Sequence, residues 1–156
     1  MNLPLLARAV AEFFPVDRII THSYEGGHPD HDAAALAVAL AVGCTGVEVL
    51  EFPAYHAFGG TMVASQFIPH SSNPAVQRVS FTPADVARKK AMFACFHSQQ
   101  HLFGRFSITE ELFRRAPEYD FLAPPHEGKL YYETRDLGMT YEKWRQFAQA
   151  VLSSKK

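Results

Sequence analysis

The feature that most constrains this 156-residue chain is a polar segment at residues 21–32, placed between two apolar runs of different character. The run before it, at 17–21, predicts a β-strand, and the alanine-rich run at 33–42 predicts a helix. A strand followed at once by a helix indicates an α/β fold. In an open α/β sheet, ligands bind where a loop leaves the carboxyl end of a strand and begins a helix. The sequence therefore predicts a functional site in this segment.

The segment contains residue types that suit a metal ion or a polar substrate. Gly26 and Gly27 lack a Cβ, which lets a ligand come close to the backbone. His28 and His31 lie three residues apart, about one helical turn, so the first turn of the helix can direct both imidazoles to one place. Asp30 can cap that helix or hold an imidazole in one tautomer. Because polar side chains are costly to bury without partners, this cluster favours a functional role.

The sequence Gly-His-Pro-Asp-His at 27–31 resembles the second motif of the PIG-L/LmbE-like zinc deacetylases. Those enzymes remove acetyl groups from N-acetylglucosamine-type substrates, so the resemblance implies an amino-sugar conjugate as the small-molecule partner. It implies that His31 binds zinc, that His28 is the catalytic histidine, and that Asp30 orients it. It also implies a Rossmann-like parallel sheet flanked by helices. The pattern of lysines and Ser-Gln within 89–99 is similar to a helix of the same family.

The family has another motif, of the His-Pro-Asp-Asp-Glu type, after its first strand. That motif supplies the other two metal ligands and the general base, but His-Pro-Asp occurs here only at 28–30. We therefore expect residues 1–156 to form one deacetylase domain that lacks the first β-α unit. A catalytic zinc normally takes three protein ligands. His22, Glu25 and Asp32 are the nearby candidates for the remaining positions.

Three functional hypotheses follow. The first is zinc-dependent hydrolysis of an N-acetyl amide on an N-acetylglucosamine-type conjugate, with the N-terminal half lost or encoded separately. The second is a non-catalytic carbohydrate-binding remnant of such an enzyme. The third, disfavoured because no serine or cysteine stands in an activating context, is a metal-independent hydrolase with His28 and Asp30 as a dyad. A homo-oligomer or a missing N-terminal half is the expected protein partner.

Composition restricts the setting in which this chemistry would operate. A net charge of −1 disfavours nucleic acid or an anionic membrane as a partner recruited by bulk electrostatics. The longest apolar run has ten residues, whereas a membrane-spanning helix needs about 20, so no membrane insertion is expected. The two cysteines, Cys44 and Cys95, form no C-x-x-C pair, which favours a reducing cytoplasm.

The remaining elements follow from periodicity and turn residues. Thr82 and Thr140 each precede a helical pattern and are expected as N-caps. We predict helices at 4–14, 83–99, 108–116 and 140–152, strands at 47–52 and 129–134, a loop at 54–60, and a β-hairpin formed by 62–69 and 76–81.

Further substrate contacts are expected from the loop at 54–60 and from the segment before the motif. Tyr55 and Phe58 can stack on a sugar ring or simply pack the loop onto the core, and His126 can reach the site or face solvent. The residues expected to contact substrate are Glu25, Gly26, Gly27, Tyr55 and His126. The histidines expected to be structural or exposed are His22, His56, His70, His97 and His101.

Overall fold

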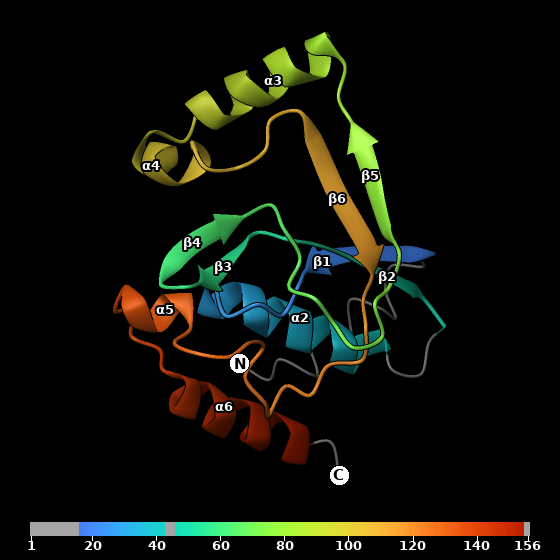
Figure 1. Ribbon diagram of the computed structural model, residues 1–156. Coiled ribbons are helices and arrows are strands. Elements are labelled where there is room, and N and C mark those ends of the chain that lie inside the picture. Colours follow the sequence, from blue (N-terminus) through green and yellow to red (C-terminus); the bar gives the residue numbers. More distant parts are fainter. Residues whose placement is uncertain (1–15, 43–45, 155–156) are drawn as a thin grey trace.

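The computed structural model describes residues 16–42 and 46–154 and shows an α/β fold with two separate sheets (Figure 1). Strand β1 (Arg18–His22) is followed by helix α2 (Pro29–Val42) and then by strand β2 (Glu48–Phe52). The two strands are parallel and hydrogen-bonded in register from end to end. The β-α-β unit predicted around the histidine segment is therefore confirmed.

Two further strands make the larger sheet mixed. The strand order is β1-β2-β6-β5, and β6 (Glu110–Arg115) lies antiparallel to both β2 and β5 (Val76–Ser80). The prediction of a parallel sheet is therefore wrong beyond its first strand pair. The helix predicted at 108–116 is also wrong, because its backbone hydrogen bonds go to neighbouring strands. One of those pairings places Arg114 beside Glu51 in the register.

The second sheet is a hairpin of β3 (Tyr55–Phe58) and β4 (Thr61–Ala64). The loop predicted at 54–60 and the hairpin predicted between 62–69 and 76–81 are both wrong, since β4 pairs with β3 and not with β5. Gly59 and Gly60 have φ angles of 56° and 78°, the pair of positive values that a two-residue type I′ turn requires. This Gly-Gly turn lets the residues before and after it pair as the antiparallel strands β3 and β4.

The chain between β5 and β6 forms three short helices that Figure 1 shows at one end of the molecule, joined to it by those strands. They are α3 (Pro83–Ala94), η1 (His97–Gln99) and α4 (Gln100–Phe103). The predicted N-cap Thr82 is confirmed, and it forms a capping box in which Thr82 and Asp85 each accept a hydrogen bond from the other's backbone. The helix ends earlier than predicted, and none of its residues is buried.

Helices α2 and α6 (Tyr141–Ser153) pack together through the core. Thr140 caps α6 as predicted, and the Trp144 indole N–H donates to the Phe121 carbonyl at 3.1 Å. The segment predicted as a strand at 129–134 instead contains the short helix α5 (Tyr131–Thr134). The buried core cluster consists of Tyr24, Ala35, Leu36, Phe121, Trp144 and Ala148.

Two predictions concern other parts of the chain. The helix predicted at 4–14 lies outside the described residues. Among the helices of 16–42 and 46–154, none has the length and apolar character needed to cross a bilayer.

Candidate active site

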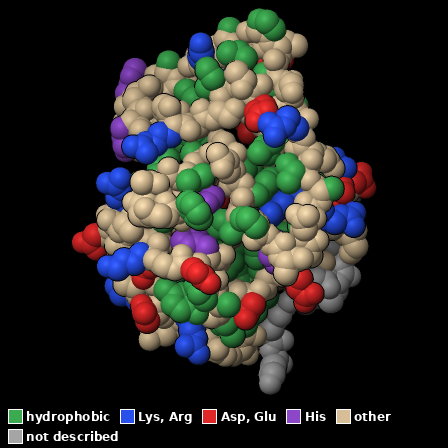
Figure 2. Space-filling view, viewed as in Figure 1, with side chains coloured by type: hydrophobic (Ala, Val, Ile, Leu, Met, Phe, Trp, Pro, Cys, Tyr) green, Lys and Arg blue, Asp and Glu red, His purple; other side chains and the backbone are tan. Residues whose placement is uncertain are grey.

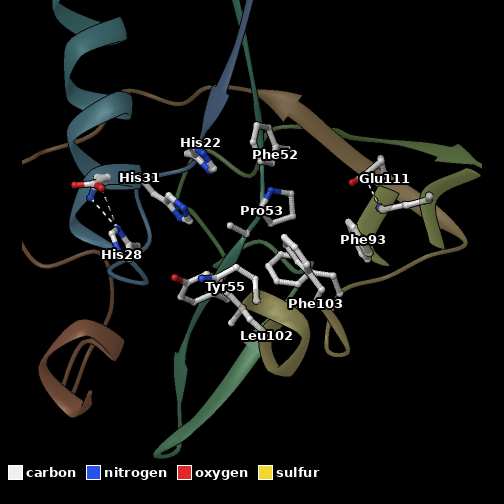
Figure 3. A pocket seen from close by; sticks show the side chains of 15 residues that line it. His22, His28, His31, Phe52, Pro53, Tyr55, Phe93, Leu102, Phe103 and Glu111 are labelled. Carbon is white, nitrogen blue, oxygen red and sulfur yellow. Dashed lines mark hydrogen bonds and ion pairs between the residues drawn. The ribbon is translucent and has the colours of Figure 1, made fainter. Parts of the chain in front are cut away.

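A cavity of about 470 Å³ opens at the carboxyl ends of β1 and β2, where α2 begins. This is the edge at which a ligand is expected in an α/β sheet. Figure 3 shows the histidines of the β1–α2 segment on one side of the cavity and Phe93 and Glu111 on the other. The lining residues are His22, His28, Asp30, His31, Phe52, Pro53, Ala54, Tyr55, Lys89, Phe93, Gln99, Leu102, Phe103, Phe106 and Glu111.

Three imidazoles lie together in the wall of the cavity. The rings of His22 and His31 are stacked, with centroids 3.9 Å apart and planes 3° from parallel. The His28 ring centroid lies 5.3 Å from that of His31. His22 was expected to be structural or exposed, and was also one of three nearby candidates for the remaining ligand positions; it stands at the carboxyl end of β1. The same topological argument that selects the following loop could have selected it.

The environment keeps two of these imidazoles neutral. Burial, followed by the neighbouring His22 and His28, lowers the pKa of His31 to about 3. Burial also lowers the pKa of His22, with a smaller contribution from His28. The Nδ1 atoms of both His22 and His31 are buried without a hydrogen-bond partner among the described residues. Neutral imidazole is the form that binds a metal ion, so both rings are chemically suited to one.

His28 and Asp30 are linked as the sequence predicts. The Asp30 backbone N–H donates to His28 Nδ1 at 3.2 Å, and the carboxylate oxygen Oδ2 lies 3.7 Å from the same nitrogen. The Asp30 side chain is 89% exposed, so water screens this charge contact. Because a nitrogen that accepts a hydrogen bond carries no proton, neutral His28 has its proton on Nε2. That nitrogen is then available as a donor.

Two buried acids hold the segment in its conformation. Glu25 is 1% exposed and accepts hydrogen bonds from the Ala54 and Tyr55 backbone N–H groups at 2.9 Å each, and from the Ser23 hydroxyl at 3.0 Å. Asp32 is fully buried and accepts from the backbone N–H groups of Glu25 and Gly26, both at 3.1 Å. Glu25 therefore binds the backbone at Ala54 and Tyr55, whereas Asp32 binds the backbone of the segment through Oδ1, and its Oδ2 is buried without a partner among the described residues. Neither residue lines the cavity.

Gly26 and Gly27 allow other segments of the chain to pack closely against the histidine segment. A Cβ on Gly27 would lie 1.8 Å from the Tyr55 carbonyl oxygen. A Cβ on Gly26 would lie 2.9 Å from Leu130 Cδ2, and its φ of 68° disfavours other residues. The close approach at Gly27 sets β3 against the histidine segment. It therefore places Tyr55 beside His31, with ring centroids 5.5 Å apart.

The other predicted substrate residues divide between the cavity and the surface. Tyr55 lines the cavity, and burial raises the pKa of its hydroxyl to about 12. Phe58 is 74% exposed and does not line the cavity. His126 lies beside His56, with ring centroids 6.1 Å apart, and the structure does not bring it into the cavity.

The opposite wall comes from α3, α4 and β6, which the prediction did not assign to the site apart from the pattern at 89–99. Lys89 and Glu111 form an ion pair there, drawn in Figure 3. Phe93 and Phe103 stack with centroids 4.5 Å apart. Glu111 belongs to the segment predicted as a helix, so no local signal placed it near the histidines.

The described residues include imidazole nitrogens, which are suitable zinc ligands, but too few donors are grouped together for a catalytic zinc site. A catalytic zinc takes three protein ligands, and no group of three or more His, Cys, Asp or Glu side chains within 16–42 and 46–154 is arranged to hold a metal ion. Comparisons with family models, curated proteins and solved structures give no match. The cavity and its lining residues are therefore the structural basis for assigning a function.

Proposed function

We propose that the cavity hydrolyses the N-acetyl amide of an N-acetylglucosamine-type conjugate in a zinc-dependent reaction. The observation that carries the proposal is the stacked pair His22 and His31, whose neutral rings line a cavity of about 470 Å³ and each have a buried Nδ1 without a partner among the described residues. The resemblance of residues 27–31 to a deacetylase motif points to the same chemistry.

His31 is the proposed metal ligand, and His22 is the donor beside it. When bound, zinc would polarise an amide carbonyl and lower the pKa of a water molecule. Within residues 16–42 and 46–154, no group of three donors is arranged to hold the ion.

His28 is the proposed catalytic residue of the chain itself. Its Nδ1 accepts the Asp30 N–H, which leaves the proton on Nε2. A histidine that lines the cavity and donates from Nε2 can stabilise a developing oxyanion or protonate a departing amine. Asp30 and the backbone of α2 fix the ring's orientation.

The aromatic lining supports a sugar as the substrate. Tyr55, Phe93 and Phe103 line the cavity, and aromatic faces pack well on the apolar faces of sugar rings. The proposal includes a Rossmann-like arrangement, which the β1-α2-β2 unit supports. It also includes a cytoplasmic location, which is consistent with the free, exposed thiol of Cys95.

The test uses the full chain, loaded with zinc and incubated with methyl N-acetylglucosaminide, with the free amine measured by fluorescamine. His31→Ala should lower both zinc content and turnover. His28→Ala should retain zinc and lose kcat by about 10²–10⁴-fold, the usual contribution of general acid–base catalysis. The matched control is His97→Ala, because His97 is exposed and outside the cavity lining. Turnover or zinc content that does not depend on His31 would overturn the proposal.

A second candidate is sugar binding without catalysis. It is favoured by the absence of a three-donor group in the described ranges, together with the aromatic wall. Saturable binding of the glycoside by NMR titration, lost in Tyr55→Ala, combined with no amine release at any zinc concentration, would favour this candidate over the hydrolase.

A further inference from the structure

A second pair of histidines, His56 and His126, lies outside the cavity of the proposed active site. His56 belongs to β3, and His126 belongs to the segment that precedes α5. Side chains alternate along a strand, so His56 points away from the cavity that its neighbour Tyr55 lines. The ring centroids of His56 and His126 are 6.1 Å apart, and neither residue lines the cavity. The pair is therefore separate from the three histidines of the cavity.

Each of these two rings has a buried nitrogen without a partner. His56 is 7% exposed. Its Nδ1 and the Nε2 of His126 have no hydrogen-bond partner among the described residues. A buried polar atom without a partner costs free energy, and in native proteins such atoms are rare unless a water or an ion binds them. Two such nitrogens, from segments far apart in the sequence, indicate a binding site for a small ligand.

The hydrogen bonding of His126 fixes its tautomer. Its Nδ1 lies 2.8 Å from the Glu127 carbonyl oxygen. A carbonyl oxygen only accepts, so Nδ1 carries the proton of the neutral ring and Nε2 has a free lone pair. A histidine that binds a metal ion almost always donates its other ring N–H to a carbonyl, a carboxylate or water. His126 has this arrangement, with Nε2 as the nitrogen left to bind an ion.

His56 is also in the form that binds a metal ion. Burial, and to a smaller extent the neighbouring His126, lowers the pKa of His56 to about 4, so the ring is neutral at pH 7. Its Nδ1 makes no hydrogen bond to a described residue that would fix the tautomer. The proton can therefore lie on Nε2, which leaves the lone pair of Nδ1 free.

The separation of the rings suits one shared ion. With metal–nitrogen distances of about 2.0–2.1 Å, two imidazoles on one ion have ring centroids roughly 4.5–6.5 Å apart, depending on the angle at the ion. The observed 6.1 Å falls within this range. No carboxylate of 16–42 and 46–154 forms an ion pair with either ring. Nitrogen donors suit Zn²⁺, Ni²⁺ and Cu²⁺, whereas Ca²⁺ and Mg²⁺ take oxygen ligands.

We propose that His56 and His126 together bind one divalent transition-metal ion of the group Zn²⁺, Ni²⁺ and Cu²⁺. Water completes the coordination, because the described part of the chain has no group of three or more His, Cys, Asp or Glu side chains placed to hold an ion. This site is distinct from the zinc position proposed at His31, and it does not rest on the proposed function.

An ion at this position joins two segments that pack against the histidine segment. Tyr55, next to His56, has its carbonyl oxygen 1.8 Å from where a Cβ on Gly27 would lie. Pro125, next to His126, has its Cγ 3.2 Å from where a Cβ on Gly26 would lie. An ion that binds the folded chain and not the unfolded one stabilises the fold. Its binding therefore strengthens the support of the cavity from outside.

The test counts the ions that the full, metal-free chain binds in calorimetric titrations with Zn²⁺ and with Ni²⁺. His56→Ala and His126→Ala should each remove the same ion. His31→Ala should remove a different one, so the combination of His31→Ala with His126→Ala should bind none. In His31→Ala the melting temperature should rise with the concentration of free Zn²⁺, and this rise should disappear when His126→Ala is added. The matched control is His97→Ala, because His97 is exposed.

A second measurement needs no substitution, which matters because His56 is buried and His56→Ala can lower stability by itself. Nitrogen NMR of the imidazoles in the unaltered chain should show that Zn²⁺ shifts Nδ1 of His56 and Nε2 of His126. The resonances of the exposed His97 and His101 should stay in place.

Two outcomes would overturn the inference. The first is an ion count that stays the same in both His56→Ala and His126→Ala. The second is a His126 Nε2 resonance that Zn²⁺ does not shift, which would show that the two nitrogens bind water only. Failure of the proposed function looks different. In that case an ion that depends on His56 and His126 remains bound, while none depends on His31 and no amine is released.

Discussion

The two walls of the cavity differ in how far their residues are buried and in the contacts that hold them. Residues 23–27 of the histidine segment are all buried, and the carboxyls of Glu25 and Asp32 accept hydrogen bonds from the backbone around them. The other wall includes Glu111 of β6 but belongs mainly to the arm, residues 76–106, in which no residue is buried. Its contacts are mainly surface ion pairs and rings stacked on one another, such as Phe93 on Phe103.

In the proposed function, this difference separates the groups that would do the chemistry from those that would select the ligand. A catalytic group must be held closely in position by its surroundings. The buried carboxyls of Glu25 and Asp32, which accept backbone hydrogen bonds, provide that for the histidines. The arm has few buried contacts, so it can open locally at a smaller free-energy cost. On the face in Figure 2, histidine side chains lie near the middle of the molecule among hydrophobic ones. We infer that the histidine wall sets the reaction geometry and that the arm adapts to the ligand.

A large contrast between the two walls is expected from one added methyl group. Gly27→Ala places a Cβ 1.8 Å from the Tyr55 carbonyl oxygen, so β3 or the histidine segment must move. The free energy of unfolding should fall by about 3 kcal/mol, the upper range for overpacking. Urea denaturation followed by circular dichroism measures it.

The control is Gly104→Ala in the arm, where the nearest atom to a new Cβ is the Gln100 carbonyl oxygen at 3.6 Å. Its effect should stay within about 0.5 kcal/mol. Equal losses from both substitutions would contradict the contrast between the two walls.

The second prediction concerns pH. Burial raises the pKa of Glu25 from 4.5 to about 8. Between these values the folded protein holds more protons than the unfolded chain, so the Glu25 contribution to the free energy of unfolding falls as pH rises. The slope approaches 1.4 kcal/mol per pH unit, roughly the value for one proton. Glu25→Gln should remove the Glu25 part of this slope, which urea denaturation at pH 6.5, 7, 7.5 and 8 measures. Burial also raises the pKa of Asp32 to about 7, so a slope of the same sign remains near pH 7 in the variant.

The range above pH 6.5 is chosen because the lowered pKa values of His22 and His31 act in the opposite direction below it. Glu48→Gln is the control. Arg18 holds the pKa of Glu48 below its usual value, so the stabilisation from Glu48 is lost only in acid. A Glu25→Gln variant that keeps the full slope above pH 6.5 would exclude Glu25 as its source.

A smaller effect is expected at the start of the arm. Thr82→Ala removes the hydroxyl that accepts the Asp85 backbone N–H and breaks the capping box of α3. The loss should be about 1 kcal/mol, the typical value for an N-cap. Because the arm has few buried contacts, amide exchange in α3 should accelerate more than exchange in α2. Equal acceleration in both helices would show that the arm and the body unfold as one unit.

The smallest effect is expected from the ion pair of Arg78 with Glu110, between β5 and β6. Arg78 is 58% exposed, so water screens the pair, and Arg78→Ala should cost about 0.5 kcal/mol or less.

Arg114→Met gives the comparison within the same sheet. Arg114 is 4% exposed and donates to Glu51 at 2.7 Å, so leaving that carboxylate unpaired should cost about 3 kcal/mol or more. Similar losses from the two variants in thermal melts would contradict this ranking.

The sequence by itself determined the elements whose signals are local. The β1-α2-β2 unit, the capping box at Thr82 and the capped helix after Thr140 all follow from periodicity and cap residues within one segment. The gathering of His28 and His31 also follows from their spacing on one helical turn. Each signal depends on residues that are close in the sequence, and these residues stay close together in the folded chain.

Only the tertiary structure decided the partners that come from far along the chain. Glu110–Arg115 has a charged sequence without alternation, and it becomes a strand because β2 and β5 supply its hydrogen bonds and Glu51 neutralises Arg114. In the same way, Glu25 holds the backbone in position because its carboxyl accepts hydrogen bonds from the Ala54 and Tyr55 N–H groups. Strand pairing and burial bring together residues that are distant in the sequence. Local propensity and residue spacing therefore do not predict these contacts.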